Sequence, residues 1–312
     1  MLFVLFVVHL MQAAGEQNKL LGEMPSYDIL CYGAICADQR ISLPRFPRPG
    51  DGMRILSERW TAGGNALNEA LALARWGRRV ALLGDRVGND APGEIVWAGL
   101  SASTVDYTYL RRDPAWPTVV CRILITPDGE RTILVVRDDR RPFDLPTPEL
   151  ISACQLVSLS RYGPGGALAL AQLARAAGCS LLLSDLSDPA DPLAALADTI
   201  CVSAAALRRQ TNGGPIEPLI TALQGLRGAA VLVTDGPNVA RAFWVADGVA
   251  QSAAVTPPAI SVRDTVGAGD TFRAAVAHGI LAQQPWPVIL EQAVAAASQG
   301  MSKVQLIDHP GP

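Results

Sequence analysis

The sequence predicts an α/β protein with a mostly parallel central sheet, helices on both faces of that sheet and a small β lid. Short apolar runs alternate with helix-forming segments in the second half of the chain, which is typical of parallel strands joined by helices. Strand-like segments in the first half are joined by proline- and glycine-rich turns, which indicates a separate exposed sheet. With 312 residues and 49% apolar content, the chain can bury a large core.

The lid is expected in two stretches of the first half. Residues 41–60 combine several prolines with an alternating pattern from Met53 to Trp60, which indicates two exposed strands joined by a proline-rich loop. In the second stretch, the turn sequence Pro-Asp-Gly-Glu at 127–130 separates two further strands. These stretches place the lid strands at about 38–62 and 118–137.

Apolar runs and helix-forming segments predict the elements around the lid. Gly77 supplies a left-handed stop for the first helix. The expected strands cover residues 29–32, 80–83, 119–126, 131–136, 156–159, 181–184 and 230–234, and the expected helices cover 66–76, 168–177 and 218–226. Open parallel sheets bind ligands at the carboxyl ends of their strands, so the loops after these strands are where chemistry is expected.

Charge and cysteine usage exclude several classes of protein. A net charge of −3 leaves no basic surface for a phosphate backbone, so we expect no nucleic-acid partner. Six dispersed cysteines without a C-x-x-C pair are expected to be reduced core residues. Only three histidines occur, and none lies at metal-ligand spacing, which disfavours a zinc site built on histidine and a Ser-His-Asp triad. We expect His278 at a packed or surface position of a helix.

The N-terminal segment is expected to lie outside the fold. Residues 1–14 hold an apolar run that resembles the core of a signal peptide, but they lack a positive leading segment and are too short to span a bilayer. We interpret residues 1–24 as an extension that is disordered or follows from a misassigned start, with Met11 or Met24 as the alternative first residue. The predicted localisation is cytoplasmic, without membrane association.

A glycine loop near the C-terminus is the most informative segment. Residues 264–272 read Asp-Thr-Val-Gly-Ala-Gly-Asp-Thr-Phe, and the apolar spacing from Phe272 to Ile280 predicts a helix behind them. Small residues at 267–269 let backbone N–H groups converge, and the helix N-terminus adds positive charge, so an anion is expected there. The loop is neither a Walker A loop nor a G-x-G-x-x-G fingerprint.

Asp270 places a carboxylate inside this expected anion site. Phosphoryl transfer needs such an arrangement, because the attacking hydroxyl must lose a proton beside the incoming phosphate. Asp270 would accept that proton, and the N–H groups of Gly267, Ala268 and Gly269 would stabilise the charge on the transferring group. The alternative is an ordinary aspartate at a helix N-terminus, a position that carboxylates favour.

The loop resembles the C-terminal signature of the ribokinase and phosphofructokinase-B (PfkB) family of carbohydrate kinases. Residues 63–70, Gly-Gly-Asn-Ala-Leu-Asn-Glu-Ala, resemble the Gly-Gly-x-x-x-Asn element of that family, and residues 29–303 can be laid along its pattern. The resemblance implies a ribokinase-like fold at 25–312 and ATP-dependent phosphorylation of a hydroxyl of a sugar or sugar-like compound. It further implies Asp270 as the general base, residues 267–269 as the anion hole, and ATP with Mg2+ as cofactors. A monovalent cation is a further candidate.

The resemblance also assigns the substrate side. It implies that Asp38, Gly63, Gly64 and Asn68 line the sugar pocket and that the lid closes over it, with lid edges pairing between the subunits of a homodimer. A glycine turn that enters an apolar helix needs no ligand, which is the alternative for residues 63–68. Arg137 either contacts an acidic substrate or is a solvated arginine; the sequence leaves both open.

Two features depart from the family pattern. The position of the family's Asn-x-x-Glu element reads Val-Ser-Ala-Ala-Ala-Leu at 202–207, so both polar residues are missing and no metal ligand is assigned. Magnesium handling by other groups, a weaker catalyst and a misaligned motif all remain open. Thr234, Gly236 and Thr265 are the expected nucleotide contacts, although Val239 replaces a second family glycine.

Two alternatives to a sugar kinase remain open from the sequence. A nucleoside kinase would use the same machinery, because Asp38 and Asn68 suit the hydroxyls of a ribose. A non-catalytic sugar- or nucleotide-binding protein is the other alternative, and the missing Asn-x-x-Glu element motivates it.

Overall fold

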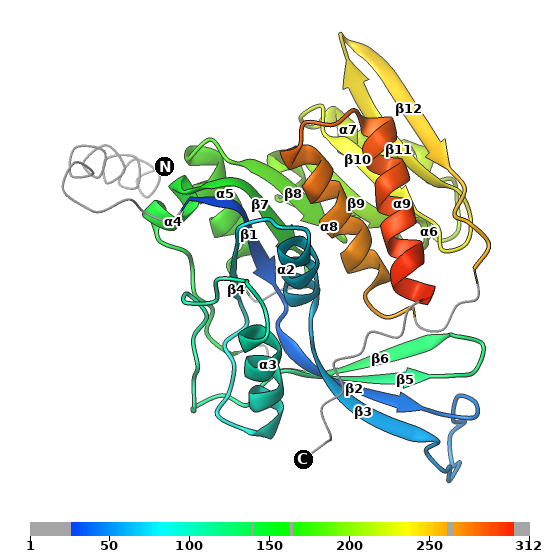
Figure 1. Ribbon diagram of the computed structural model, residues 1–312. Coiled ribbons are helices and arrows are strands. Elements are labelled where there is room, and N and C mark those ends of the chain that lie inside the picture. Colours follow the sequence, from blue (N-terminus) through cyan, green and yellow to red (C-terminus); the bar gives the residue numbers. More distant parts are fainter. Residues whose placement is uncertain (1–25, 139, 163–164, 261–264, 303–312) are drawn as a thin grey trace, which may run out of the picture.

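Two β-sheets and the helices packed on the larger one make up the structure (Figure 1). The computed structural model describes residues 26–138, 140–162, 165–260 and 265–302. The expectation for residues 1–24 therefore lies outside the described residues, as does Asp264 of the glycine loop.

The larger sheet has eight strands in the order β12-β11-β10-β9-β8-β7-β1-β4. Neighbouring strands from β4 to β10 run parallel, and β11 and β12 continue the sheet as an antiparallel hairpin. The parallel strands are buried on both faces, which explains why they occur in the sequence as short continuous apolar runs. The strands are β1 (Tyr27–Gly33), β4 (Val80–Gly84), β7 (Cys154–Ser160), β8 (Ser180–Ser184), β9 (Thr199–Ser203), β10 (Ala230–Thr234), β11 (Ala240–Ala246) and β12 (Val249–Val255).

Helices cover both faces of this sheet and bury one hydrophobic cluster on each (Figure 1). Alternate residues of β1 enter opposite clusters: Ile29 and Cys31 join one, and Leu30 and Tyr32 join the other. The first cluster includes residues of α2 (Asn65–Arg75), α3 (Ala91–Ser101), α8 (Ala268–Leu281) and α9 (Trp286–Ser302). The second includes residues of α4 (Pro148–Ser152), α5 (Ala167–Ala176), α6 (Ala204–Gln210), α7 (Glu217–Gly225) and the short 3-10 helix η1 (Ala194–Leu196).

The smaller sheet has four strands in the order β3-β2-β5-β6 and projects from the larger one (Figure 1). Strand β2 (Cys36–Ser42) pairs antiparallel with β3 (Ser57–Gly63) and parallel with β5 (Val120–Ile125). β6 (Arg131–Val136) closes the sheet as an exposed edge, joined to β5 by a turn in which Gly129 adopts a φ of 83°. This four-stranded unit is called the small sheet below.

The fold class predicted from the sequence is confirmed. Strands at 131–136 and 230–234 have the expected bounds, and Gly77 adopts the expected left-handed conformation, with a φ of 80°. The first strand of the small sheet begins at Cys36 rather than near Ile41, because much of it is buried and does not show the alternation of an exposed strand. The strand expected from Met53 begins only at Ser57.

The cysteines are reduced, as expected. All six carry free thiols, and five of them are buried. Across the described ranges, no helix is long and apolar enough to cross a bilayer.

Candidate active site

The glycine loop forms the N-terminus of helix α8. Gly267 takes a left-handed conformation with a φ of 77° and precedes the first helical residue, Ala268. Its carbonyl accepts hydrogen bonds from the N–H and the hydroxyl of Thr271, at 2.9 and 3.0 Å. The first N–H groups of an α-helix have no acceptor within the helix and carry partial positive charge. The Ala268 N–H donates to the Thr265 carbonyl over 3.3 Å, and the anion hole at residues 267–269 stays a prediction.

Asp270 lies in the first turn of α8 and faces helix α2. The Asn68 side-chain nitrogen, Nδ2, donates to Asp270 Oδ2 over 2.8 Å, although the two residues are 202 positions apart. A Cβ built on Gly267 would lie 3.8 Å from Asn68 Nδ2 and 3.9 Å from Asp270 Oδ2. The structure thus brings together three of the residues that the sequence singled out.

Burial raises the pKa of Asp270 to about 6. The charge of Arg273 and the hydrogen bond from Asn68 lower this pKa, whereas the negative charges of Glu69 and Asp185 raise it. The side chain keeps 19% of its surface exposed, so a proton can reach it. A carboxyl group with this pKa is ionised near neutral pH and is a stronger base than an ordinary aspartate.

Arg273, one turn after Asp270 on α8, bonds to residues of α2 and β8. Its Nε is 2.7 Å from Glu69 Oε2 in an ion pair whose side chains are only 4% and 2% exposed. Its Nη1 donates to the Ser184 hydroxyl at 2.5 Å, and its Nη2 donates to the Asn65 carbonyl at 2.8 Å. Nη2 also lies 3.7 Å from Asp270 Oδ1. Arg273 was not among the residues predicted from the sequence, although a charge inside the apolar start of α8 was a usable signal.

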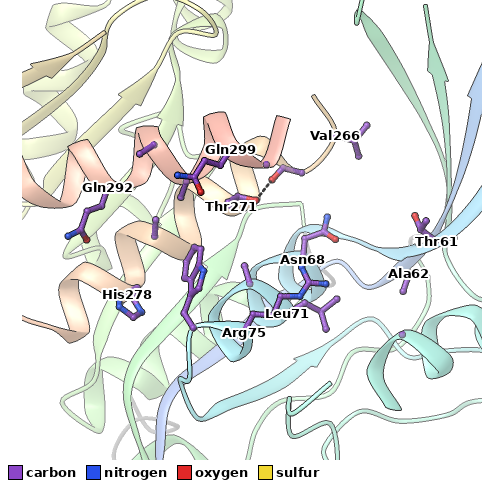
Figure 2. Close-up of a pocket in the computed structure, with 18 of the residues that line it drawn as sticks. Thr61, Ala62, Asn68, Leu71, Arg75, Val266, Thr271, His278, Gln292 and Gln299 are labelled. Atoms are coloured by element: carbon purple, nitrogen blue, oxygen red, sulfur yellow. Dashed lines mark hydrogen bonds between the residues drawn. The ribbon is translucent and has the colours of Figure 1, made fainter. Parts of the chain in front are cut away.

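A cavity of about 910 Å³ opens beside the loop, a size suited to small-molecule ligands (Figure 2). Asn68 and Val266 point toward it from α2 and from the loop, and Thr61 approaches from the small sheet (Figure 2). His278 of α8 lines it too, with its ring 5.8 Å from that of Trp76. Further lining residues are Arg40, Arg75, Gly267, Thr271, Gln292 and Gln299.

Arg40 and Thr61 are cavity residues that the sequence analysis missed. Thr61 is the register partner of Asp38 across β2 and β3, and Arg40 is the next residue on the same face of β2 as Asp38. The hydroxyl oxygen of Thr61 is buried and has no hydrogen-bond partner within the described part of the chain. Both positions follow from the pairing of β2 with β3, which no short-range sequence pattern encodes.

Asp38, Gly63 and Gly64 lie next to the cavity-lining residues Arg40 and Thr61 but do not line the cavity themselves. The Asp38 side chain is on the buried small-sheet face, and a Cβ on Gly63 would overlap its carboxylate. Gly64 has a φ of 99° and precedes the first residue of α2, where a Cβ would overlap the Ala34 carbonyl. Both glycines are therefore required by close packing.

The expected nucleotide contacts lie at two places. Thr234 ends β10, and Gly236 follows with a φ of 57°. Between them, Asp235 accepts two hydrogen bonds from Arg208, at 2.8 and 2.7 Å, and lines a second cavity of about 400 Å³ with residues of α6 and α7. Thr234 and Gly236 themselves line neither cavity.

Thr265 joins the loop to the small sheet. Its hydroxyl accepts a hydrogen bond from Arg131 Nη1 at 2.7 Å and donates to the Gly129 carbonyl at 3.3 Å. The turn between β5 and β6 therefore touches the residue two positions before Gly267.

The position of the Asn-x-x-Glu element does not fit a metal ion. Ser203 caps helix α6, and its hydroxyl accepts a hydrogen bond from the Ala206 N–H at 3.2 Å. Ala206, at the position of the family's glutamate, offers no side-chain oxygen. Mg2+ prefers carboxylates and phosphates, so this helix start supplies no suitable protein ligand.

Arg137 is neither solvated nor a residue of the large cavity. Its Nη2 lies 3.1 Å from the carboxylate of Asp85, with the two side chains 17% and 0% exposed. Its Nη1 donates to the Tyr162 carbonyl at 3.2 Å. The solvated alternative is wrong, because the buried Asp85 carboxylate holds the guanidinium.

The fold and the loop together define a ribokinase-like α/β phosphotransferase. A sequence profile described as pfkB family carbohydrate kinase matches residues 26–310. The chain belongs to this family and is a carbohydrate kinase, a phosphotransferase with an alcohol group as acceptor.

Individual relatives agree with this assignment. Ribokinase of Arabidopsis thaliana is 26% identical, over 92% of this chain and 79% of its own. An ATP-dependent ribose-1-phosphate kinase of Halopiger xanaduensis is 30% identical, over 79% of this chain and 82% of its own. The solved structure of the Arabidopsis ribokinase complexed with ribose and ATP has a TM-score of 0.73 and 24% identity, covering 88% of this chain and 93% of that one.

Proposed function

We propose that this kinase transfers a phosphoryl group from ATP to a hydroxyl of a sugar or sugar-like compound, with Asp270 as the general base. The observation that carries the proposal is the Asp270 carboxylate, held by Asn68 at 2.8 Å beside a left-handed loop that lines a large cavity. A base, an anion-binding backbone and a space for the acceptor thus occur side by side.

The proposed reaction follows from this arrangement. The acceptor hydroxyl gives its proton to Asp270 as its oxygen bonds to the γ-phosphorus, and ADP leaves as the bond from that phosphorus to the bridging oxygen breaks. The N–H groups of Gly267, Ala268 and Gly269 stabilise the negative charge of the transferring group. The hydrogen bond from Asn68 fixes the carboxylate in place beside Gly267.

We assign acceptor binding to Asp38, Gly63, Gly64 and Asn68, with the small sheet as a lid. Two observations support this assignment: Asp38 is packed on Gly63, and its register partner Thr61 lines the cavity. A closing lid would exclude water, which otherwise competes for the phosphoryl group.

We assign nucleotide binding to Thr234, Gly236 and Thr265. Thr234 is the last residue of β10, Gly236 follows it, and Thr265 lies in the glycine loop. Mg2+ would travel with the ATP phosphates, which bind it in most kinases. Ser203 and Ala206 do not fit it, so no step is assigned to the ion here. The six free thiols favour a reducing cytoplasmic location.

The pH dependence of kcat/KM tests the assigned base. Asp270 must be ionised to accept a proton, and its pKa is raised to about 6. The rate should therefore be constant near pH 8 and fall about tenfold per pH unit below the pKa, with an acidic limb near pH 6 rather than near 4. The variant Asn68→Leu removes a hydrogen bond that lowers this pKa, so its limb should move to higher pH. A limb that stays near 4 in both proteins would contradict the assignment.

An ADP-release assay over free sugars, sugar phosphates, sugar acids and nucleosides tests the substrate class. ADP formation with sugars, dependent on Mg2+, is the expected result. Turnover of nucleosides alone would indicate a nucleoside kinase. Saturable ligand binding without any ADP would indicate a non-catalytic binding protein and would refute the proposal.

We propose a homodimer formed through the small sheet. All six residues of β6 are exposed, and Ile133, Leu134, Val135 and Val136 are each about half exposed on an open sheet edge. Such an apolar edge normally requires cover. Val135→Lys should shift the protein to a monomer in sedimentation velocity. Val249 on β12 is the matched control, because it is 56% exposed and Val135 is 58% exposed; Val249→Lys should leave the dimer intact. A wild-type monomer at micromolar concentration would refute the dimer.

A further inference from the structure

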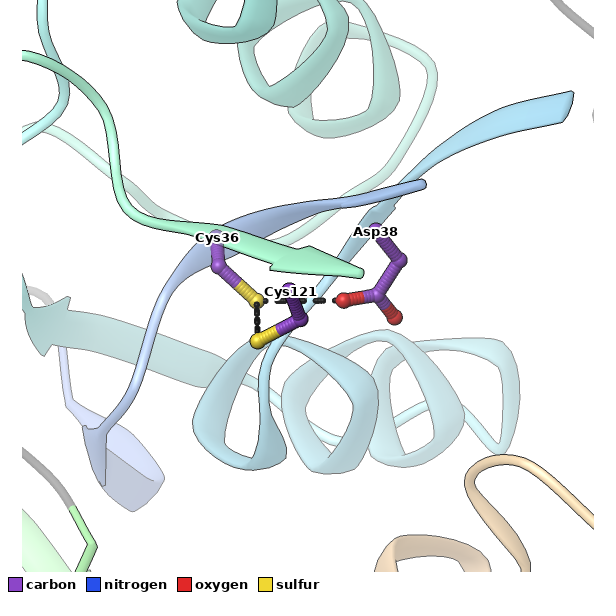
Figure 3. A group of neighbouring side chains, drawn as sticks. All are labelled: Cys36, Asp38 and Cys121. Carbon is purple, nitrogen blue, oxygen red and sulfur yellow. Dashed lines mark hydrogen bonds between the residues drawn. The ribbon is translucent and has the colours of Figure 1, made fainter. Parts of the chain in front are cut away.

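Two cysteines and an aspartate of the small sheet lie within bonding reach of one point (Figure 3). Cys36 Sγ lies 3.4 Å from Cys121 Sγ and 3.2 Å from Asp38 Oδ1. One ligand atom from each of the three residues lies within 4.8 Å of the others. Cys36 and Asp38 are buried, and Cys121 is partly exposed. Both cysteines were expected to be core residues, and nothing in the proposed reaction uses them.

The strand register explains why the three side chains converge. Cys36 and Asp38 are two residues apart on β2 and therefore share a face, and Cys121 of β5 is the register partner of Asp38. Arg40 is the next residue on that face of β2, and it lines the large cavity. The cluster thus lies on the side of the small sheet that faces the proposed active site.

Two of the three separations are close to those around a tetrahedral zinc ion, and the third, between Cys121 Sγ and the Asp38 carboxylate, is within 4.8 Å. Zn–S bonds of about 2.3 Å and Zn–O bonds of about 2.0 Å place two sulfurs about 3.8 Å apart and a sulfur and an oxygen about 3.5 Å apart. The observed separations are 3.4 and 3.2 Å, so each has to lengthen by only about 0.3–0.4 Å. A disulfide would instead require the sulfurs to approach from 3.4 Å to about 2.05 Å. Metal binding therefore needs the smaller rearrangement.

We propose that Cys36, Cys121 and Asp38 form a site for a thiophilic divalent cation, with Zn2+ as the representative ion. Two thiolates and a carboxylate supply three protein ligands, and the fourth position stays open for water or another small ligand. On binding, the thiols give up their protons to solvent, and the cation compensates the resulting negative charge. Arg40, next along β2, adds further positive charge on the same face.

Binding at this site has a consequence for the kinase. Zn2+ on Asp38 would occupy the carboxylate that we assign to the acceptor hydroxyls, so the ion should inhibit in competition with the sugar. This consequence rests on the proposed function. The binding itself does not, and it is measured without turnover.

A calorimetric titration of the reduced full-length protein with ZnCl2 tests the site. One Zn2+ per chain is expected in the wild type. Loss of an orienting partner outside the ligand set costs about 10- to 100-fold in metal affinity, so Cys121→Ser, which removes a ligand, should weaken binding by about 100-fold or more. Cys154→Ser, at a buried cysteine of β7 outside the cluster, should bind as the wild type does. Equal affinity in all three proteins, or no stoichiometric binding, would overturn the proposal.

Cobalt provides a second measurement that does not depend on how the variants fold. Co2+ added to the wild type should produce a near-ultraviolet sulfur-to-metal charge-transfer band, which Zn2+ should then remove. A cobalt-loaded protein without that band would have no thiolate ligand, and the site would be refuted. If binding is confirmed but Zn2+ fails to inhibit, the assignment of Asp38 to the substrate is wrong and the metal site stands.

Discussion

Replacing Asp270 by asparagine should lower kcat by about 10² to 10⁴, the usual cost of removing a general base. The amide has nearly the size of the carboxylate and can accept the hydrogen bond from Asn68, so the folded structure should persist. It cannot take up the proton of the acceptor hydroxyl. The measurement is steady-state ADP release at pH 8, where the wild-type carboxylate is ionised.

Asp247→Asn provides the matched control for this variant. Asp247 lies in the exposed turn between β11 and β12 with a φ of 51°, a conformation that asparagine also tolerates. This change should leave kcat unaffected. If Asp270→Asn retains nearly full activity while its circular dichroism matches the wild type, Asp270 is not the base.

Arg273→Met should lower the free energy of unfolding by about 3–5 kcal/mol, because it leaves the Glu69 carboxylate buried without its counter-charge. It also removes donors to the Ser184 hydroxyl and the Asn65 carbonyl. Urea unfolding at pH 8 measures the loss. In any folded fraction, the pKa of Asp270 should rise further, because Arg273 normally lowers it, and the acidic limb of kcat/KM should move upward with it.

Two comparisons show whether the buried charge is the cause. Arg79→Met removes an exposed partner of Asp28, and exposed pairs contribute only about 0–1 kcal/mol. The double variant Glu69→Leu/Arg273→Met removes both buried charges and should be more stable than Arg273→Met alone. If Arg273→Met costs no more than Arg79→Met, the buried pair does not stabilise the protein.

Much of the fold could be predicted because its core strands are buried on both faces and flanked by turn residues. Ala230–Thr234 is such a strand, and it was placed without error. Helix α3 was missed, although Asp90 accepts a hydrogen bond from the Gly93 N–H at its start, because Pro92 and Gly93 suggest a loop. Strand β9 was missed although its first four residues, Thr-Ile-Cys-Val at 199–202, have strand character.

The site could be predicted only where chemistry is local in the sequence. The loop around Asp270 is contiguous, so its small residues and carboxylate indicated an anion site directly. The pairing of Asn68 with Asp270 was not predictable from spacing, since 202 positions separate the two residues. The cluster of Cys36 with Cys121 depends on the β2–β5 register, which no short-range pattern encodes.

The contact of Thr265 with the turn between β5 and β6 has a mechanical consequence. Gly129 of that turn and Arg131, the first residue of β6, are hydrogen-bonded to a residue only two positions before Gly267. Movement of the hairpin and movement of the glycine loop are therefore linked by two hydrogen bonds. An acceptor that drew the hairpin inward would therefore also pull on the loop that we propose to bind the transferring phosphate.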